Sequence, residues 1–99
     1  MLKIFCVFDS VAGAYLQPFF MQSKGEALRG WIDVVNDPKT SFNKHPADYT
    51  LFELGEYDSL TGSIVTHEVK ISLGTALEHQ RKNAVTSMDQ VVMPSLVTN

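Results

Sequence analysis

The stretch from Asp48 to Gly74 limits the possible folds of this chain most, because it has the pattern of a β-hairpin. In residues 49–57 the side chains would alternate between the two faces of a strand, with Thr50, Phe52 and Leu54 on one face and Leu51 and Glu53 on the other. Residues 63–71 are rich in β-branched side chains, which favour strands. Asp58 suits the first position of a type I turn, and Gly62 suits a left-handed position that closes the loop. The sequence therefore predicts two antiparallel strands joined by a short loop.

Two earlier segments also have the pattern of regular elements. Residues 2–9 alternate with apolar side chains on both faces, which predicts a central strand or an edge strand covered by a partner chain. Residues 23–26 match a capping box, in which serine and glutamate side chains accept hydrogen bonds from backbone N–H groups at a helix start. Pro38 cannot continue a helix, so we expect the helix over residues 24–36. Its apolar stripe consists of Leu28, Trp31, Ile32 and Val35.

These elements predict an α+β domain, with a small, mainly antiparallel sheet on which one main amphipathic helix packs. A chain of 99 residues has room for one modest core. We assign the β-α-β-β core domain to residues 1–75. Residues 76–99 are expected to start with a short helix that Thr75 caps and that runs to Asn83, followed by a docking tail or an edge strand. Such a thin sheet has exposed edges, which favours a homodimer.

The two longer connections are predicted as loops. Residues 36–47 are polar and contain two prolines, which is typical of an exposed loop. Residues 10–22 are more apolar than most loops. Their rings Tyr15, Phe19 and Phe20 either fold back onto the core or form a contact surface for a second subunit or for stacked bases.

The charge and the cysteine content narrow the class of protein. The net charge is −3, from 8 Lys and Arg against 11 Asp and Glu, so the totals indicate no strongly basic groove for nucleic acid. A few cations on one face would still suffice. Cys6 is the single cysteine, which excludes an intrachain disulfide and favours a reducing compartment. The N-terminal apolar run ends at Asp9, too early for an export signal, and no run is long enough for a membrane span. We expect a soluble intracellular protein.

No group of residues has the spacing of a catalytic or metal site, so we expect no enzyme, no cofactor and no metal. His45, His67 and His79 are too far apart in the sequence for a local metal motif. The acidic residues around the hairpin suit a solvated face better than an acid–base pair. A hydrolase stays possible only if the fold brings a histidine and carboxylates together in a cleft.

Aromatic rings with nearby cations are the best candidates for a ligand site. Proteins that bind single-stranded DNA stack bases on exposed rings and hold the phosphates with cations. The same rings also suit the second face of a packed sheet or a dimer interface. The candidates for nucleic-acid binding are Lys3, Phe5, Arg29, Lys39, Lys44, Phe52, Tyr57 and Lys70, and those for partner binding are Tyr15, Phe19 and Phe20.

A series of short motifs follows in order along residues 1–74. The series consists of Phe8-Asp9, Ala12-Gly13-Ala14-Tyr15, Pro18-Phe19, Ala27, Arg29, Val35-Asn36-Asp37, Pro46-Ala47-Asp48-Tyr49, Leu51, Gly55, Tyr57-Asp58, Thr61-Gly62 and Leu73-Gly74. In this order it resembles the small nonstructural protein of gokushovirus-type microviruses, tailless bacteriophages with circular single-stranded DNA genomes. The resemblance implies an early, non-capsid phage protein that binds DNA, is linked to synthesis of the single-stranded genome, and is located in the host bacterial cytoplasm.

Two hypotheses for the function follow. In the first, the chain is a noncatalytic phage protein that binds single-stranded DNA during genome replication or before packaging, with an affinity that falls steeply with salt. In the alternative, it is a protein–protein adaptor that recruits the viral replication initiator, the procapsid or a host replication factor without direct DNA contact. The acidic second half of the chain and the apolar residues 10–22 fit the alternative.

Overall fold

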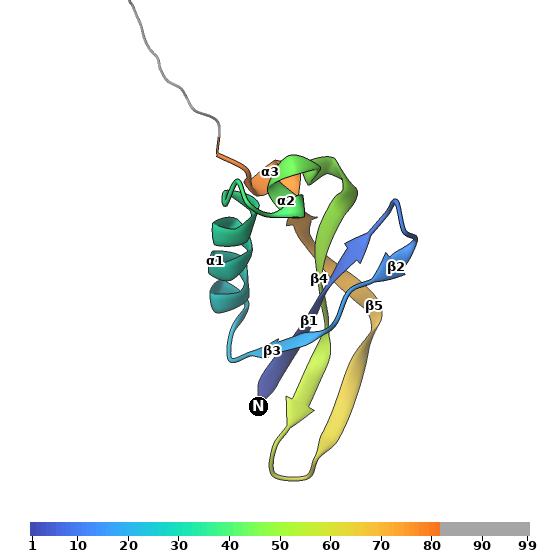
Figure 1. Cartoon of the computed structure of the whole chain (residues 1–99). Coiled ribbons are helices and arrows are strands. Elements are labelled where there is room, and N and C mark those ends of the chain that lie inside the picture. The colour runs from blue at the N-terminus through green and yellow to red at the C-terminus, as the bar shows by residue number, and fades with distance from the viewer. Residues whose placement is uncertain (82–99) are drawn as a thin grey trace, which may run out of the picture.

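The computed structural model describes residues 1–81 of the chain (Figure 1). The expected continuation of the C-terminal helix to Asn83, and the tail or edge strand after it, lie outside the described residues. Residues 1–81 form an α+β fold, with one five-stranded antiparallel sheet and one helix longer than a single turn. The expected fold class is therefore confirmed in outline.

The sheet is built around the first strand of the chain. β1 pairs with β4 on one side, and β4 pairs in turn with β5, which forms one edge of the sheet in residues 1–81. On its other side β1 pairs with two short strands, β2 and β3. All pairs are antiparallel. The strands are β1 (Leu2–Asp9), β2 (Ala14–Tyr15), β3 (Phe19–Met21), β4 (Tyr49–Asp58) and β5 (Ser63–Thr75).

The two short strands correct the prediction of a loop over residues 10–22. After β1 the chain turns back at Gly13, which has a positive φ of 69° and donates its N–H to the carbonyl oxygen of Asp9 at 2.8 Å. The Asp9 carboxylate also accepts hydrogen bonds from the backbone N–H groups of Val11 and Ala12. The returning chain then pairs with β1, so the second edge of β1 is satisfied within the same chain.

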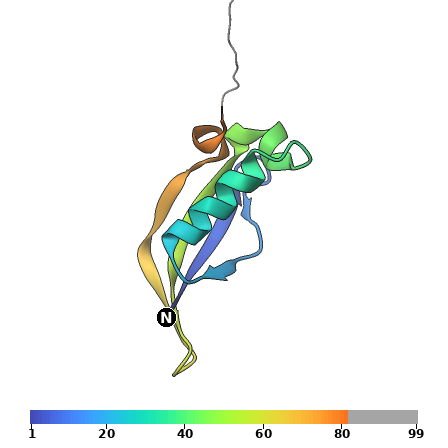
Figure 2. The ribbon, with the colours of Figure 1, turned by 90° about the vertical axis from the view of Figure 1, so that its left-hand side faces the viewer.

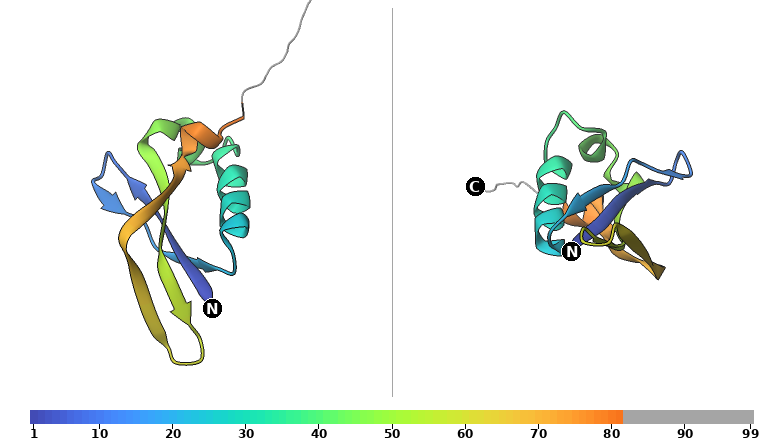
Figure 3. Two further views of the ribbon diagram at one scale, coloured as in Figure 1. Left: turned by 180° about the vertical axis from the view of Figure 1, so that it is seen from behind. Right: turned by 90° about the horizontal axis from the view of Figure 1, so that it is seen from below.

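α1 (Lys24–Val35) covers one face of the sheet, and no helix of residues 1–81 lies on the opposite face (Figure 3). The predicted cap by Ser23 is present, because its Oγ accepts the N–H of Glu26 at 3.2 Å, but the Glu26 carboxylate accepts the N–H of Gln22 instead of that of Ser23, so the capping box is incomplete. Asn36 ends the helix, and its side-chain amide donates a hydrogen bond to the carbonyl oxygen of Ile32 at 2.7 Å. Trp31 and Val35 of the predicted stripe are buried, whereas Leu28 and Ile32 are half-buried and Ala27 is buried in addition. The buried core consists of Phe5, Val7, Ala27, Trp31, Val35, Leu51 and Ala76.

Short helices close one end of this core, which corrects the prediction of a loop over residues 36–47. α2 (Ser41–Lys44) is followed directly by the 3₁₀ turn η1 (Pro46–Asp48). The ring of Phe42 in α2 contacts those of Trp31 and Tyr49, with ring centroids 5.2 and 4.8 Å apart.

α3 (Ala76–His79) completes the same end of the molecule. The predicted cap by Thr75 is confirmed, and its side chain forms a full capping box with that of Glu78. Ala76 is fully buried, so α3 contributes to the core that α1 and the sheet form.

The β4–β5 hairpin has the predicted turn and an unexpected irregularity. Gly62 has a φ of 76° and donates its N–H to the carbonyl oxygen of Asp58 at 2.7 Å. Further along, Gly55 pairs with Thr66, whereas Glu53 pairs with Ile71. Four residues of β5 therefore lie opposite one residue of β4, and β5 bows away from β4 (Figure 2).

We predict that Gly55→Ala destabilises the fold, because β5 crosses too close to this position for a side chain. An added Cβ would overlap the carbonyl oxygen of Val65 and lie 2.7 Å from Cα of Thr66. We expect a loss of about 2 kcal/mol or more in the free energy of unfolding, measured by urea denaturation.

Gly30→Ala is the matched control, because nothing lies within 4 Å of a Cβ at that helical position. We expect that change to be neutral or to stabilise the protein by up to about 1 kcal/mol. Equal stability of Gly55→Ala and the wild type would contradict the register of β4 and β5.

Candidate functional site

The side of the sheet away from α1 carries a set of aromatic rings. Because Phe5 and Val7 of β1 point toward α1, the alternation of a strand places Ile4, Cys6 and Phe8 on the opposite side. Residues paired across antiparallel strands share a face, so their partners also lie there. We call this surface the outer aromatic face, and its rings are Phe8, Tyr15, Phe20, Phe52 and Tyr57.

The rings of the outer aromatic face form two groups. Tyr15 contacts Phe8 and Phe52, with ring centroids 4.8 and 6.1 Å apart. Phe20 contacts Tyr57 edge to face, at 5.8 Å. Tyr15 is 46% exposed and Phe20 45%, and the other three rings are half-buried. Each group therefore offers solvent an aromatic surface that neighbouring rings hold in place.

Buried side chains of β1 lie between the two groups. Ile4 and Cys6 are almost fully buried. Burial raises the pKa of the Cys6 thiol, and Sγ donates a hydrogen bond to the carbonyl oxygen of Leu16 at 2.8 Å. Cys6 is thus a structural residue, in line with the behaviour of buried thiols.

Lys70 is the one predicted cation that the structure brings to the outer aromatic face. Its Nζ lies 5.5 Å from the centroid of the Tyr15 ring, within the range of a cation–π contact. The side chain comes from the bowed part of β5 and is exposed. Rings and a cation therefore meet at this point, as the stacking hypothesis requires.

Two predicted aromatic residues lie on the covered face instead. Phe5 is fully buried beneath α1, which corrects its prediction as a base-stacking residue. Phe19 is half-buried and stacks on Phe5, with ring centroids 5.7 Å apart. The physical reason is that β1 is apolar on both faces, so its alternation alone does not indicate which face the helix covers.

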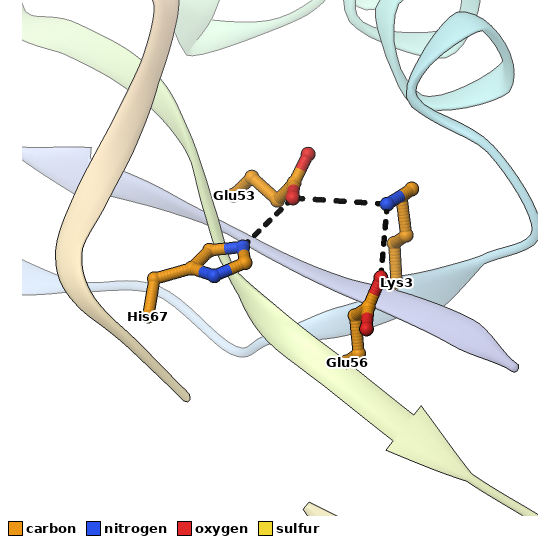
Figure 4. Close-up of polar contacts among 4 residues, drawn as sticks. All are labelled: Lys3, Glu53, Glu56 and His67. Carbon is orange, nitrogen blue, oxygen red and sulfur yellow. Dashed lines mark hydrogen bonds and ion pairs between the residues drawn. The ribbon is translucent and has the colours of Figure 1, made fainter. Parts of the chain in front are cut away.

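The other predicted cations also lie on the side of α1, so the structure does not assemble them around the outer aromatic face. Arg29 is exposed on α1 itself, and Lys39 and Lys44 belong to the segment whose α2 packs on Trp31. Lys3 points to the covered face, where its Nζ lies 3.2 Å from Glu56 Oε2 (Figure 4). The expected positive edge next to the rings is corrected accordingly.

A cluster of polar side chains around the buried Glu53, on the covered face, was not predicted. Glu53 is 6% exposed, and its Oε2 lies 2.8 Å from His67 Nε2 and 3.9 Å from Lys3 Nζ (Figure 4). A buried carboxylate is costly unless such partners compensate it. The cluster therefore holds the bowed part of β5 against β4. One signal was visible in the sequence, since the strand pattern places Glu53 on the same face as Leu51.

This cluster brings a histidine and carboxylates together, whereas a hydrolase was expected only if they met in a cleft. It lines neither of two cavities formed by residues 1–81. One has a volume of about 310 Å³ and lies between α1 and residues 16–21, and the other, of about 400 Å³, is lined by Asn36, Asn43 and Arg81 among others. Within residues 1–81 no group of three or more histidine, cysteine, aspartate or glutamate side chains has the arrangement of a metal site.

Comparison with known proteins assigns the chain to a family. The family model of the phage ORF5 protein matches residues 2–79, which is most of the chain. The chain belongs to the phage ORF5 protein family. No curated protein and no solved structure matches it. The helices of this phage ORF5 family member, as far as residue 81, are all too short to cross a membrane.

We predict that His67→Ala destabilises the protein, because the buried carboxylate of Glu53 then keeps only Lys3 at 3.9 Å. The expected loss is about 1–2 kcal/mol in the free energy of unfolding, measured by chemical denaturation at neutral pH.

His45→Ala serves as the control, since His45 is exposed and its side chain makes no hydrogen bond or ion pair within the described residues. We expect this change to stay within about 0.5 kcal/mol of the wild type. If both variants lose the same amount, the Glu53–His67 contact does not stabilise the fold.

Proposed function

We propose that this phage ORF5 family member binds single-stranded DNA without catalysis, by stacking bases on its outer aromatic face. The observation that carries the proposal is that five rings from four strands share the one sheet face that α1 leaves free. Every base has an aromatic face, so stacking is tolerant of sequence and contributes about 1–3 kcal/mol per base.

The arrangement of the rings supports more than one stacked base. Tyr15 and Phe20, the two most exposed rings, belong to different groups and to different strands, β2 and β3. Both strands pair with the same edge of β1, so the two rings follow each other along one direction of the sheet. A single strand that runs along this edge would meet both groups in turn.

The charge distribution sets the expected salt dependence. Lys70 is the single predicted cation that contacts this face in the described part of the chain, and the net charge of the whole chain is −3. The affinity for single-stranded DNA is therefore expected to fall only gently with salt, and not steeply as expected from the sequence. One phosphate contact per protomer corresponds to a slope of about −0.7 in log K against log salt concentration.

The resemblance to microvirus proteins supports DNA rather than RNA as the ligand. In that setting the protein acts in the host bacterial cytoplasm, where it covers the single-stranded genome during replication or before packaging. The match to the phage ORF5 family supports the phage origin.

A second candidate is the protein–protein adaptor for a viral initiator, a procapsid or a host factor. The apolar cavity between α1 and residues 16–21 favours it, because Leu16 at its border is 40% exposed and Trp31 and Phe42 also line it. A cavity of about 310 Å³ suits an apolar side chain of a partner segment. This candidate predicts partner binding that does not change when DNA is removed.

Replacement of a ring on the outer aromatic face tests the main proposal. We expect Tyr15→Leu and Phe20→Leu each to weaken binding of a labelled oligothymidine about tenfold, because the apolar volume is kept while the stacking surface is lost. Fluorescence anisotropy gives the affinities, and circular dichroism checks the fold.

Two matched controls separate the face from the rest of the surface. Val34→Ala changes an exposed apolar side chain on α1, and Lys39→Gln removes a cation from the opposite side. We expect both to bind like the wild type, whereas Lys70→Gln weakens binding and flattens the salt dependence. A wild-type protein that does not bind oligothymidine at low salt would overturn the proposal and favour the adaptor.

A further inference from the structure

The edge of the sheet formed by β5 has the properties of a strand that pairs with another chain. Within residues 1–81, β5 (Ser63–Thr75) pairs with β4 on one side, at residues 63–66 and again from Ile71, and with no strand on the other side. Edge strands of natural sheets are often short or interrupted by proline, because a free edge pairs readily with a strand of another chain. β5 contains no proline.

The side chains of β5 are also unusually apolar for an exposed strand. Val69 is 79% exposed, Val65 64%, Ile64 58% and Ile71 44%. They lie on both faces of the strand, so one helix or loop packed on one face would not cover them all. A strand added at the edge of β5 brings neighbouring side chains to both faces at once.

The sequence of β5 is complementary to itself in one antiparallel register. Val69 is the middle residue of the range 63–75, so a copy of β5 centred on Val69 overlaps the entire strand. In that register Glu68 lies opposite Lys70 of the copy, and Lys70 opposite Glu68. Both side chains are exposed. The bow in β5 also moves this middle part outward, away from β4 (Figure 2).

We propose that two copies of this chain form a dimer in which the β5 strands pair antiparallel about Val69. We choose a second copy as the partner strand, because Glu68 of each copy then lies opposite Lys70 of the other. A two-fold axis relates the copies, which is the common symmetry of soluble dimers. The result is one continuous ten-stranded sheet.

The position of this axis determines how the two faces are arranged. Antiparallel pairing of identical strands requires a two-fold axis perpendicular to the sheet, so each face of one copy continues into the same face of the other. Both α1 helices then lie on one side, and both outer aromatic faces lie on the other. The role of this joined surface in DNA binding rests on the proposed function, whereas the dimer itself does not.

Charge exchange at the central pair tests the register without DNA. We expect Glu68→Lys alone, and Lys70→Glu alone, to weaken dimerisation by roughly tenfold or more in sedimentation velocity, because each places like charges opposite each other. Mixing the two single variants restores a dimer, since each lysine then faces a glutamate. The double variant E68K/K70E dimerises like the wild type.

Disulfide cross-linking tests the same register independently. In Val69→Cys the two new thiols lie directly opposite, where Cα atoms are about 5 Å apart and a disulfide forms on oxidation. In Val65→Cys the thiols of the two copies are separated by eight residues, roughly 27 Å along the strands, and do not cross-link. Both positions are exposed, so both variants are expected to fold.

The results that would overturn the dimer are distinct from those that would overturn DNA binding. A wild-type chain that stays monomeric, or single variants that dimerise as well as the wild type, contradict pairing about Val69. So does cross-linking of Val65→Cys with none of Val69→Cys. If the dimer passes these tests but binds no oligothymidine, the dimer proposal is supported and the proposed function is refuted.

Discussion

The packing of one helix on one face of a sheet is the constraint on which the rest of this structure depends. α1 places Ala27, Trp31 and Val35 on Phe5 and Leu51, and this contact forms the core. A chain of 99 residues has no second long helix within its described part to cover the other face. Yet β1 is apolar on both faces, and β2 and β3 add further rings. The outer aromatic face is a direct consequence of this imbalance, because buried apolar surface on one side leaves the other side to solvent or to a ligand.

The bow of β5 depends on a second, more local set of contacts. Gly55 lets the backbone of β5 approach β4 closely at Thr66, and beyond this point four residues of β5 lie opposite one of β4. The buried Glu53 then holds the bowed segment through His67. The same bow brings Lys70 over the ring of Tyr15 and exposes Val69 at the edge. One irregularity in pairing thus shapes both the outer aromatic face and the edge that we propose as the dimer interface.

The sequence alone predicted the elements that depend on interactions between residues close together in the chain. The hairpin with its left-handed Gly62 and the caps by Ser23 and Thr75 were predicted because each depends on residues a few positions apart. β2 and β3 were missed, since strands of two and three residues have too little alternation and form only by pairing with β1. For the candidate site, alternation identified strand faces but not the one that α1 covers. Phe52, Tyr57 and Lys70 lie on the outer aromatic face, with Phe52 and Tyr57 on the same face because of the register shift between β1 and β4. Phe5 lies on the covered face, and Phe8 was overlooked although it shares a face with Cys6.

Hydroxyl-radical footprinting with mass spectrometry tests most directly whether the sheet has one covered face and one face for single-stranded DNA. In the free protein we predict oxidation of Tyr15 and Phe20 and none of Phe5. Addition of oligothymidine should protect Tyr15, Phe20 and Tyr57, while exposed residues on α1 such as Arg29 keep their reactivity. Oxidation of Phe5 in the folded protein, or protection confined to the side of α1, would contradict the account.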